Sequence, residues 1–232
     1  MLSLIYFSKY FHCGKGENGP CKRYNINMRK LFILFCLAGV ALGACAPEKL
    51  PSARFDGQEY ALAFSAREQS GFVNEYLLPG EDLENYSKMV GVYSFPQMKG
   101  ISAQQAAEQM ARLMQLKNPQ APFDIHNSAD KEAALVDFLV FSPGGSMAEY
   151  NVFKYMPDGK GLKAVQFVAR WYATQSKDAL KNARDFAQTY LGNRQEWVKK
   201  VDSMEVPGVY KREYALEEPA EQPVLPRPQN AD

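Results

Sequence analysis

Histidine and cysteine are scarce in this 232-residue chain, which holds two histidines and four cysteines. Only His126 and Cys45 lie beyond residue 44, and neither Gly-x-Gly-x-x-Gly nor a P-loop sequence occurs there. Zinc sites usually combine four cysteine, histidine or carboxylate ligands, and a histidine base needs a positioned partner and a nucleophile. We therefore expect no catalytic residue, no metal site and no cofactor. We expect His126 to be exposed at the edge of a short strand.

The apolar run Leu31–Ala44 is too short to span a membrane. It has 14 apolar or small residues, whereas a bilayer-spanning helix needs about 20. Arg29 and Lys30 precede the run, and a basic start before a short apolar core is typical of a secretory signal peptide. An ordinary signal peptide and a buried helix that happens to end in cysteine are the alternatives.

The end of this run, Leu42-Gly43-Ala44-Cys45, resembles the bacterial lipobox. The resemblance implies that the Cys45 sulfur receives a diacylglyceryl group, that cleavage occurs before Cys45, and that the new amino terminus is acylated, for example with palmitate. It also implies an outer-membrane location facing the periplasm if the cell is Gram-negative, because Ala46 is not a retention signal of the aspartate kind.

The position of the signal defines the expected organisation of the chain. Met28 resembles the start of a lipoprotein signal, so we expect residues 1–27 to be a misassigned extension, with a genuine longer leader as the alternative. A segment rich in proline and poor in large apolar residues is expected to be disordered or polyproline-like, as at 215–232. The expected divisions are a signal peptide at 28–44, a lipidated tether at 45–57, a globular domain at 58–214 and a Pro-rich tail at 215–232.

The composition beyond residue 44 excludes several classes of protein. A single cysteine allows no internal disulfide, so the domain must fold by its core. Of the 27 basic and 26 acidic residues, six basic and one acidic residue lie in 1–44, which leaves 21 and 25 and a net charge of −4. Nucleic-acid binding requires a basic surface. We therefore expect no nucleic acid as a partner. The lipobox resemblance implies attachment to the membrane through the lipid on Cys45, and an envelope protein is the partner expected for a protein at that location.

Alternating apolar residues and turn sequences predict an antiparallel sheet. Ser142–Ser146 and Pro157-Asp158-Gly159-Lys160 are typical hairpin turns between three strands rich in Val, Phe and Tyr. Both faces of the strand around Leu135–Phe141 are apolar, so we expect both to be covered. The expected strands are 59–66, 72–78, 88–95, 123–127, 133–141, 147–156 and 161–173.

Two helices are expected to cover the sheet. Ser102 and Gln105 form a capping-box sequence, and apolar residues at helical spacing follow as far as Asn118-Pro119. A second helix is expected over 177–201, with a kink or division at Gly192-Asn193. The prediction is an α+β fold with an antiparallel sheet of about six to seven strands and two main helices, arranged as an α/β/α sandwich.

The segment NEYLLPGEDLENYSKMVGVYSF, Asn74–Phe95, followed by this order of elements, resembles the PsbP-like fold. The resemblance implies a non-catalytic binding or assembly role in the exported space.

Aromatic residues on the predicted strands are the remaining candidates for a site. Tyrosine and tryptophan are enriched at binding surfaces, but sheets also favour them for packing, so both interpretations stay open. The candidate binding-surface residues are Tyr86, Tyr93, Tyr150, Tyr155, Trp171 and Tyr172.

The leading hypothesis is an envelope lipoprotein whose periplasmic domain binds or supports another envelope component without catalysis. The alternative is a lipoprotein that binds a small ligand or a glycan. A carboxylate-dependent enzyme using Glu75, Glu81 or Asp137 is the third hypothesis. Asp137 stands out because it interrupts an apolar strand, where it must be either satisfied by partners or turned toward water.

Overall fold

The computed structural model describes residues 50–142, 145–173 and 179–216, which belong to one compact unit beginning at Leu50. The expectations about Cys45, the signal peptide and the tail beyond residue 216 lie outside the described residues. None of the helices in the described part meets the length and hydropathy that a membrane span requires.

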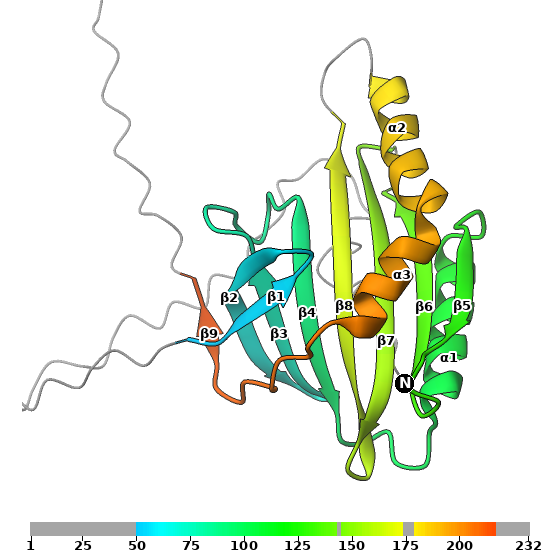
Figure 1. Ribbon diagram of the computed structural model, residues 1–232. Coiled ribbons are helices and arrows are strands. Elements are labelled where there is room, and N and C mark those ends of the chain that lie inside the picture. The colour runs from blue at the N-terminus through cyan, green and yellow to red at the C-terminus, as the bar shows by residue number, and fades with distance from the viewer. Residues whose placement is uncertain (1–49, 143–144, 174–178, 217–232) are drawn as a thin grey trace, which may run out of the picture. The chain divides into compact units, whose positions relative to one another are not determined.

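One antiparallel sheet dominates the fold (Figure 1). Its strand order is β1-β2-β3-β4-β8-β7-β6-β5, and β9 pairs with β2 beyond the segment that β1 covers. Every pairing among the described strands is antiparallel. The strands are β1 Ser52–Phe55, β2 Gln58–Glu68, β3 Gly71–Leu77, β4 Lys88–Phe95, β5 Phe123–Asn127, β6 Ala134–Phe141, β7 Met147–Asp158, β8 Gly161–Tyr172 and β9 Tyr214–Ala215.

Both predicted hairpin connections join paired strands, and residues 143–144 of the first lie outside the described residues. Asp158 pairs with Gly161, so Gly159 and Lys160 make a two-residue turn in which Gly159 has a φ of 61°. At the other end of β7, the Ser142 backbone N–H donates to the Met147 carbonyl at 2.9 Å and connects the end of β6 to the start of β7. These turns align β6, β7 and β8 in register.

Helices α1 Ala103–Lys117, α2 Ala179–Gly192 and α3 Arg194–Ser203 flank the sheet. The predicted capping box is present, with Ser102 accepting from the Gln105 backbone and Gln105 accepting from the Ser102 backbone. The second predicted helix is divided into α2 and α3 between Gly192 and Arg194, where the sequence indicated a kink or division.

The helices lie on opposite faces of the sheet, with α1 behind β5 and β6 and with α2 and α3 in front (Figure 1). The strand β6 is consequently buried on both faces, as its apolar pattern predicts. The front core packs Trp197 of α3 against Phe167 of β8, with ring centroids 5.2 Å apart. Tyr190 of α2 stacks on Tyr150 of β7 at 5.3 Å.

The α+β class is confirmed, but the predicted number of strands was wrong: the described sheet has nine, not six or seven. One additional strand, β1, lies within the range expected to be a tether. It buries Ala53 and Phe55 on alternate positions, and the Phe55 ring lies 4.6 Å from that of Phe167. The other, β9, has only two residues, too few to show a periodic pattern.

A strap, defined here as residues 204–216, connects α3 to the opposite edge of the sheet. The buried side chain of Asn74 holds it by donating to the Tyr210 carbonyl at 2.9 Å and accepting from the Tyr210 N–H at 2.8 Å. Ser65 donates to the Arg212 carbonyl at 2.6 Å. Asn74 and Ser65 therefore give the strap backbone the hydrogen-bond partners that a neighbouring strand would otherwise supply.

Candidate functional site

The structure divides the six predicted binding-surface residues between the core and the surface. Tyr86, Tyr93, Tyr150 and Tyr155 are buried, Trp171 is half-buried, and Tyr172 is 36% exposed. The packing interpretation therefore holds for the four buried tyrosines, and the binding-surface interpretation is wrong for them. The reason is that these tyrosines lie under other parts of the chain, where aromatic rings serve as core residues.

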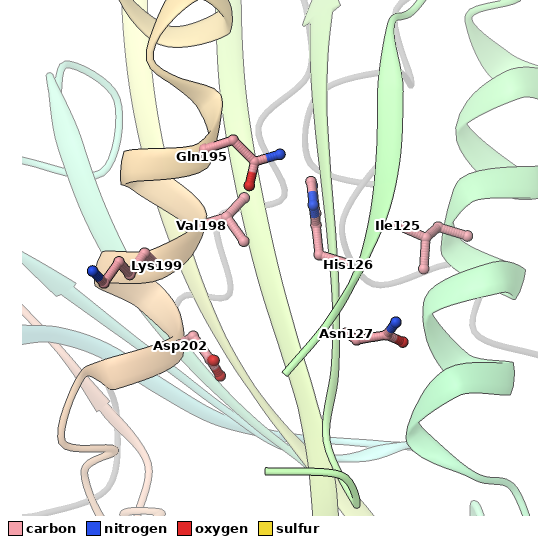
Figure 2. A pocket seen from close by; sticks show the side chains of 7 residues that line it. All are labelled: Ile125, His126, Asn127, Gln195, Val198, Lys199 and Asp202. Carbon is pink, nitrogen blue, oxygen red and sulfur yellow. The ribbon is translucent and has the colours of Figure 1, made fainter. Parts of the chain in front are cut away.

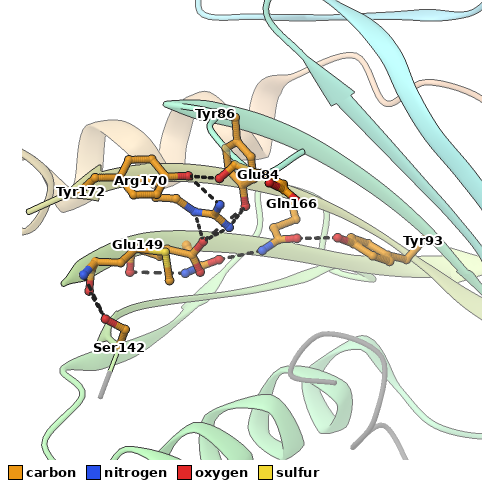
Figure 3. A network of polar contacts seen from close by, with 10 residues as sticks. Glu84, Tyr86, Tyr93, Ser142, Glu149, Gln166, Arg170 and Tyr172 are labelled. Carbon is orange, nitrogen blue, oxygen red and sulfur yellow. Dashed lines mark hydrogen bonds and ion pairs between the residues drawn. The ribbon is translucent and has the colours of Figure 1, made fainter. Parts of the chain in front are cut away.

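Two of the six candidates, Tyr86 and Tyr172, bind Arg170 in a polar network that Tyr93 joins through Gln166 (Figure 3). The Arg170 Nε donates to the Glu149 carboxylate at 2.6 Å, and its Nη2 donates to the Tyr86 hydroxyl. Its Nη1 donates to the Tyr172 hydroxyl at 2.9 Å, which in turn donates to the Glu84 carbonyl at 2.7 Å. The network links β7 and β8 to the loop before β4.

The polar network continues across the same face through two amides. Tyr93 donates to Gln166 Oε1 at 2.7 Å, and Gln166 Nε2 donates to Asn151 Oδ1 at 2.7 Å (Figure 3). Asn151 donates to the Glu149 carbonyl at 3.4 Å. Buried polar groups in such a chain are costly unless each has a partner, so the network fixes the relative positions of β4, β7 and β8.

A second buried charge, Asp137 of β6, lies on the front face. His126 Nε2 lies 2.7 Å from one carboxylate oxygen, and Arg194 Nε donates to the other at 2.7 Å. Asp137 is completely buried, and the His126 side chain is only 11% exposed. The prediction of an exposed histidine was wrong, because His126 turns toward the carboxylate rather than toward water. The alternative in which partners satisfy Asp137 is confirmed.

Asp137 also influences the neighbouring Tyr150. Burial raises the pKa of the Tyr150 hydroxyl, and the negative charge of Asp137 raises this pKa further. Tyr150 therefore stays protonated at neutral pH. The Asp137 carboxylate of β6 also binds both His126 of β5 and Arg194 of α3, and it therefore anchors the beginning of α3 to these two strands.

The end of α3 has a similar anchor. Asp202 accepts hydrogen bonds from the Ser128 hydroxyl at 2.5 Å and the Ala129 N–H at 2.9 Å, and Lys154 Nζ lies 2.9 Å from its carboxylate. Partial burial opposes ionisation of Asp202, but these three interactions together outweigh it and lower the pKa of its carboxyl group. Asp202 is therefore ionised at neutral pH and connects α3 to the loop after β5.

Between these anchors, two adjoining grooves separate α3 from β5. Figure 2 shows His126 of β5 and Gln195 and Val198 of α3 turned toward the same space. One groove has a volume of about 420 Å³ and is lined by Ile125, His126, Asn127, Gln195, Val198, Lys199 and Asp202. The other has a volume of about 510 Å³ and is lined by Asp124, Leu191, Gly192, Asn193, Arg194, Gln195 and Glu196. We refer to the two together as the α3 groove.

The lining of the α3 groove restricts what it can bind. Lys199 and Arg194 carry positive charge, and Asp124, Glu196 and Asp202 carry negative charge, a formal sum of −1. Side-chain amides supply neutral donors and acceptors, and the described residues that line the two grooves include no phenylalanine, tyrosine or tryptophan. In the part of the chain that the structure describes, no three histidine, cysteine, aspartate or glutamate residues are grouped to hold a metal ion.

Sequence reasoning found one residue of this region and missed most of the others. Asp137 gave a signal because a carboxylate in an apolar strand needs partners. Arg194 and Asp202 gave none, since they lie 57 and 74 residues along the chain from Asp137 and Ser128, the residues they bind. Glu81, a carboxylate considered for catalysis, accepts instead from the Ser87 backbone and hydroxyl at 2.9 and 2.5 Å.

A protein-family model matches residues 47–206, which is more than half of the chain, and the chain therefore belongs to this family. The matched range runs from just before β1 to just after α3. It includes both buried charge networks and the α3 groove, and it ends before β9. A search of curated proteins found no match.

Proposed function

We propose that this protein is a lipoprotein of the bacterial cell envelope, with a non-catalytic domain that binds or assembles with another envelope component. The observation that carries the proposal is the lipobox-like Leu42-Gly43-Ala44-Cys45 placed shortly before a folded domain. β1 begins at Ser52, seven residues after Cys45. On this proposal the lipid holds the domain at the membrane, and the domain faces the periplasm at the outer membrane of a Gram-negative cell.

The pairing of buried charges favours binding over catalysis. A general base must be able to accept a proton from its substrate. Asp137 is bound by His126 and Arg194, and Glu149 is bound by Arg170. These ion pairs hold elements together, which is the requirement of a rigid binding module.

We also propose that the domain has a PsbP-like fold. The described order of three strands, a helix, four strands and a divided final helix, with β1 and β9 added at the edge, agrees with the order expected for that resemblance. A binding or assembly role is what the resemblance implies. The glycan alternative has less support, because sugar rings favour the faces of phenylalanine, tyrosine or tryptophan, and the described lining of the α3 groove includes none of these.

The test compares the wild-type protein with Cys45→Ser in a bacterial host, by intact mass and by membrane fractionation. The expected wild-type mass begins at Cys45 and includes three acyl chains, with the protein in the membrane fraction. The Cys45→Ser variant is expected to lack the acyl mass and to leave that fraction. A wild-type protein that is uncut, or cut at another residue and soluble, would contradict the proposal.

A further inference from the structure

The strand β5 forms one end of the sheet and pairs only with β6 among the described strands. One hydrogen bond shows which positions of β5 are hydrogen-bonded to β6. In it the Leu139 N–H donates to the Pro122 carbonyl at 3.1 Å. Pro122 and Leu139 continue the register in which Phe123 lies opposite Phe138. In antiparallel pairs, hydrogen-bonded and non-hydrogen-bonded positions alternate. Phe123, Ile125 and Asn127 therefore direct their backbone N–H and C=O groups away from β6.

Within the described part of the chain, a local hydrogen bond occupies the Ile125 N–H, one of these outward groups. The Ile125 N–H donates to the Asp124 carboxylate of its own strand at 3.0 Å. An aspartate that caps the adjacent amide can rotate away when a better acceptor arrives, because its side chain is 53% exposed. Exposed strand edges of this kind are templates for pairing with another extended chain.

Charges beside the edge indicate what that chain carries. Asp124 and Glu196 both line the larger part of the α3 groove, with side chains 53% and 61% exposed. Arg194 lies 3.7 Å from Asp124, a loose contact compared with its 2.7 Å bond to Asp137. A basic side chain is complementary to Asp124, and Glu196, which pairs with Lys200 at 2.7 Å, adds negative charge beside it. The side-chain amides of Gln195 and Asn193 suit a peptide backbone.

We propose that the outward edge of β5 binds an extended peptide segment of a partner protein, which pairs with Ile125 and places a lysine or arginine against Asp124 and Glu196. This inference rests on the proposed function only in taking the partner to be an envelope component. The pairing itself depends on β5 and the α3 groove and not on the lipid.

The test uses the full-length protein in detergent and a phage-displayed library of random peptides as the probe. Selected peptides are expected to share a basic residue within an extended, proline-free stretch. Their affinities are then measured by fluorescence polarisation for the wild type and for variants. Ile125→Pro removes the central outward N–H, and Asp124→Lys reverses the charge; each is expected to weaken binding about tenfold or more.

Glu213→Lys is the matched control, because it makes the same charge change on an exposed residue of the strap, whose strand β9 pairs with β2 and not with β5. It is expected to leave the affinity unchanged. Asn127→Pro gives a second way to block the edge at an exposed position if Ile125→Pro does not fold, as judged by circular dichroism. Selected peptides that bind all variants equally, or the absence of any enriched peptide, would overturn the proposal. A wild-type dimer that Asp124→Lys separates would overturn it too, by showing a second copy on the edge.

This outcome is separable from the lipoprotein test. Peptide binding that persists in Cys45→Ser supports the edge site whether or not the wild type is acylated. Loss of acylation would contradict only the proposed anchor.

Discussion

Arg170 and Glu149 show at the scale of single residues how a buried charge depends on its partner. The Arg170 side chain is 1% exposed and the Glu149 side chain 9%. Arg170→Met is expected to lower the free energy of unfolding by about 3–5 kcal/mol, because the glutamate stays buried without its cation. Arg170→Met with Glu149→Leu is expected to recover most of this loss. Urea unfolding of both variants measures the difference, and a double variant less stable than the single one would contradict the explanation.

Asp202 gives a residue-scale prediction that depends on pH. Its hydrogen bonds lower the pKa of its carboxyl group in the folded state, so the stabilisation is present above the unfolded pKa and is lost as the pH falls through the folded pKa. Asp202→Asn is expected to lower the free energy of unfolding by about 1–3 kcal/mol at neutral pH. The difference from the wild type should shrink in acid, below the usual aspartate range. A difference that stays constant with pH would indicate packing rather than charge.

The strap gives a prediction at the scale of elements. Asn74→Ala removes both hydrogen bonds to the Tyr210 backbone and the one that Asn74 donates to Ser65. The backbone N–H of Leu216, which donates to the Ala63 carbonyl at 2.9 Å, is expected to exchange with solvent faster as the strap detaches. Hydrogen exchange measured by mass spectrometry follows this segment. Exchange that rises equally throughout the sheet would instead show global destabilisation. Glu213→Ala on the strap is the control and should leave the exchange of both the strap and the sheet unchanged.

The elements that sequence predicted well are those that contain their own boundary signals. Ser102 and Gln105 define the start of α1, and Gly192-Asn193 marks the division between α2 and α3. β9 has no signal of its own, because its two residues are ordered by β2 and by side chains on β2 and β3. β1 was missed for a related reason: its four residues follow two prolines, and Phe55 is the only large apolar side chain among them.

The candidate site was less predictable than the elements, since its residues meet only after folding. Tyrosine composition suits both a binding surface and a core, so the sequence could not assign Tyr150 to the core without knowing that α2 covers β7. The α3 groove lies between elements separated by more than 60 residues, and its carboxylates are also typical of solvent-exposed helix faces. Asp137 gave a signal in advance, because it interrupts an otherwise apolar strand, although its partners lie on other elements.

At the scale of the whole molecule, the proposed anchor and the described domain are close together in the chain. Six residues separate Cys45 from Ser52, so an extended chain allows at most about 25 Å between them. A fluorophore on Ser52→Cys is expected to transfer energy efficiently to acceptor lipids in vesicles that carry the acylated protein. The label is specific on the proposed function, because the other three cysteines precede the expected cleavage position and Cys45 would carry the lipid.

An insertion between Cys45 and Ser52 provides the control for this distance. Twenty glycine and serine residues add about 25 Å of root-mean-square length to a flexible chain, so energy transfer from the same label should fall clearly. Equal transfer in both proteins, at the high level, would mean that the domain itself contacts the bilayer and that the lipid is not the sole attachment. Equal transfer at a low level would contradict attachment at Cys45. The comparison therefore separates a tethered domain from one that binds the membrane through its own surface.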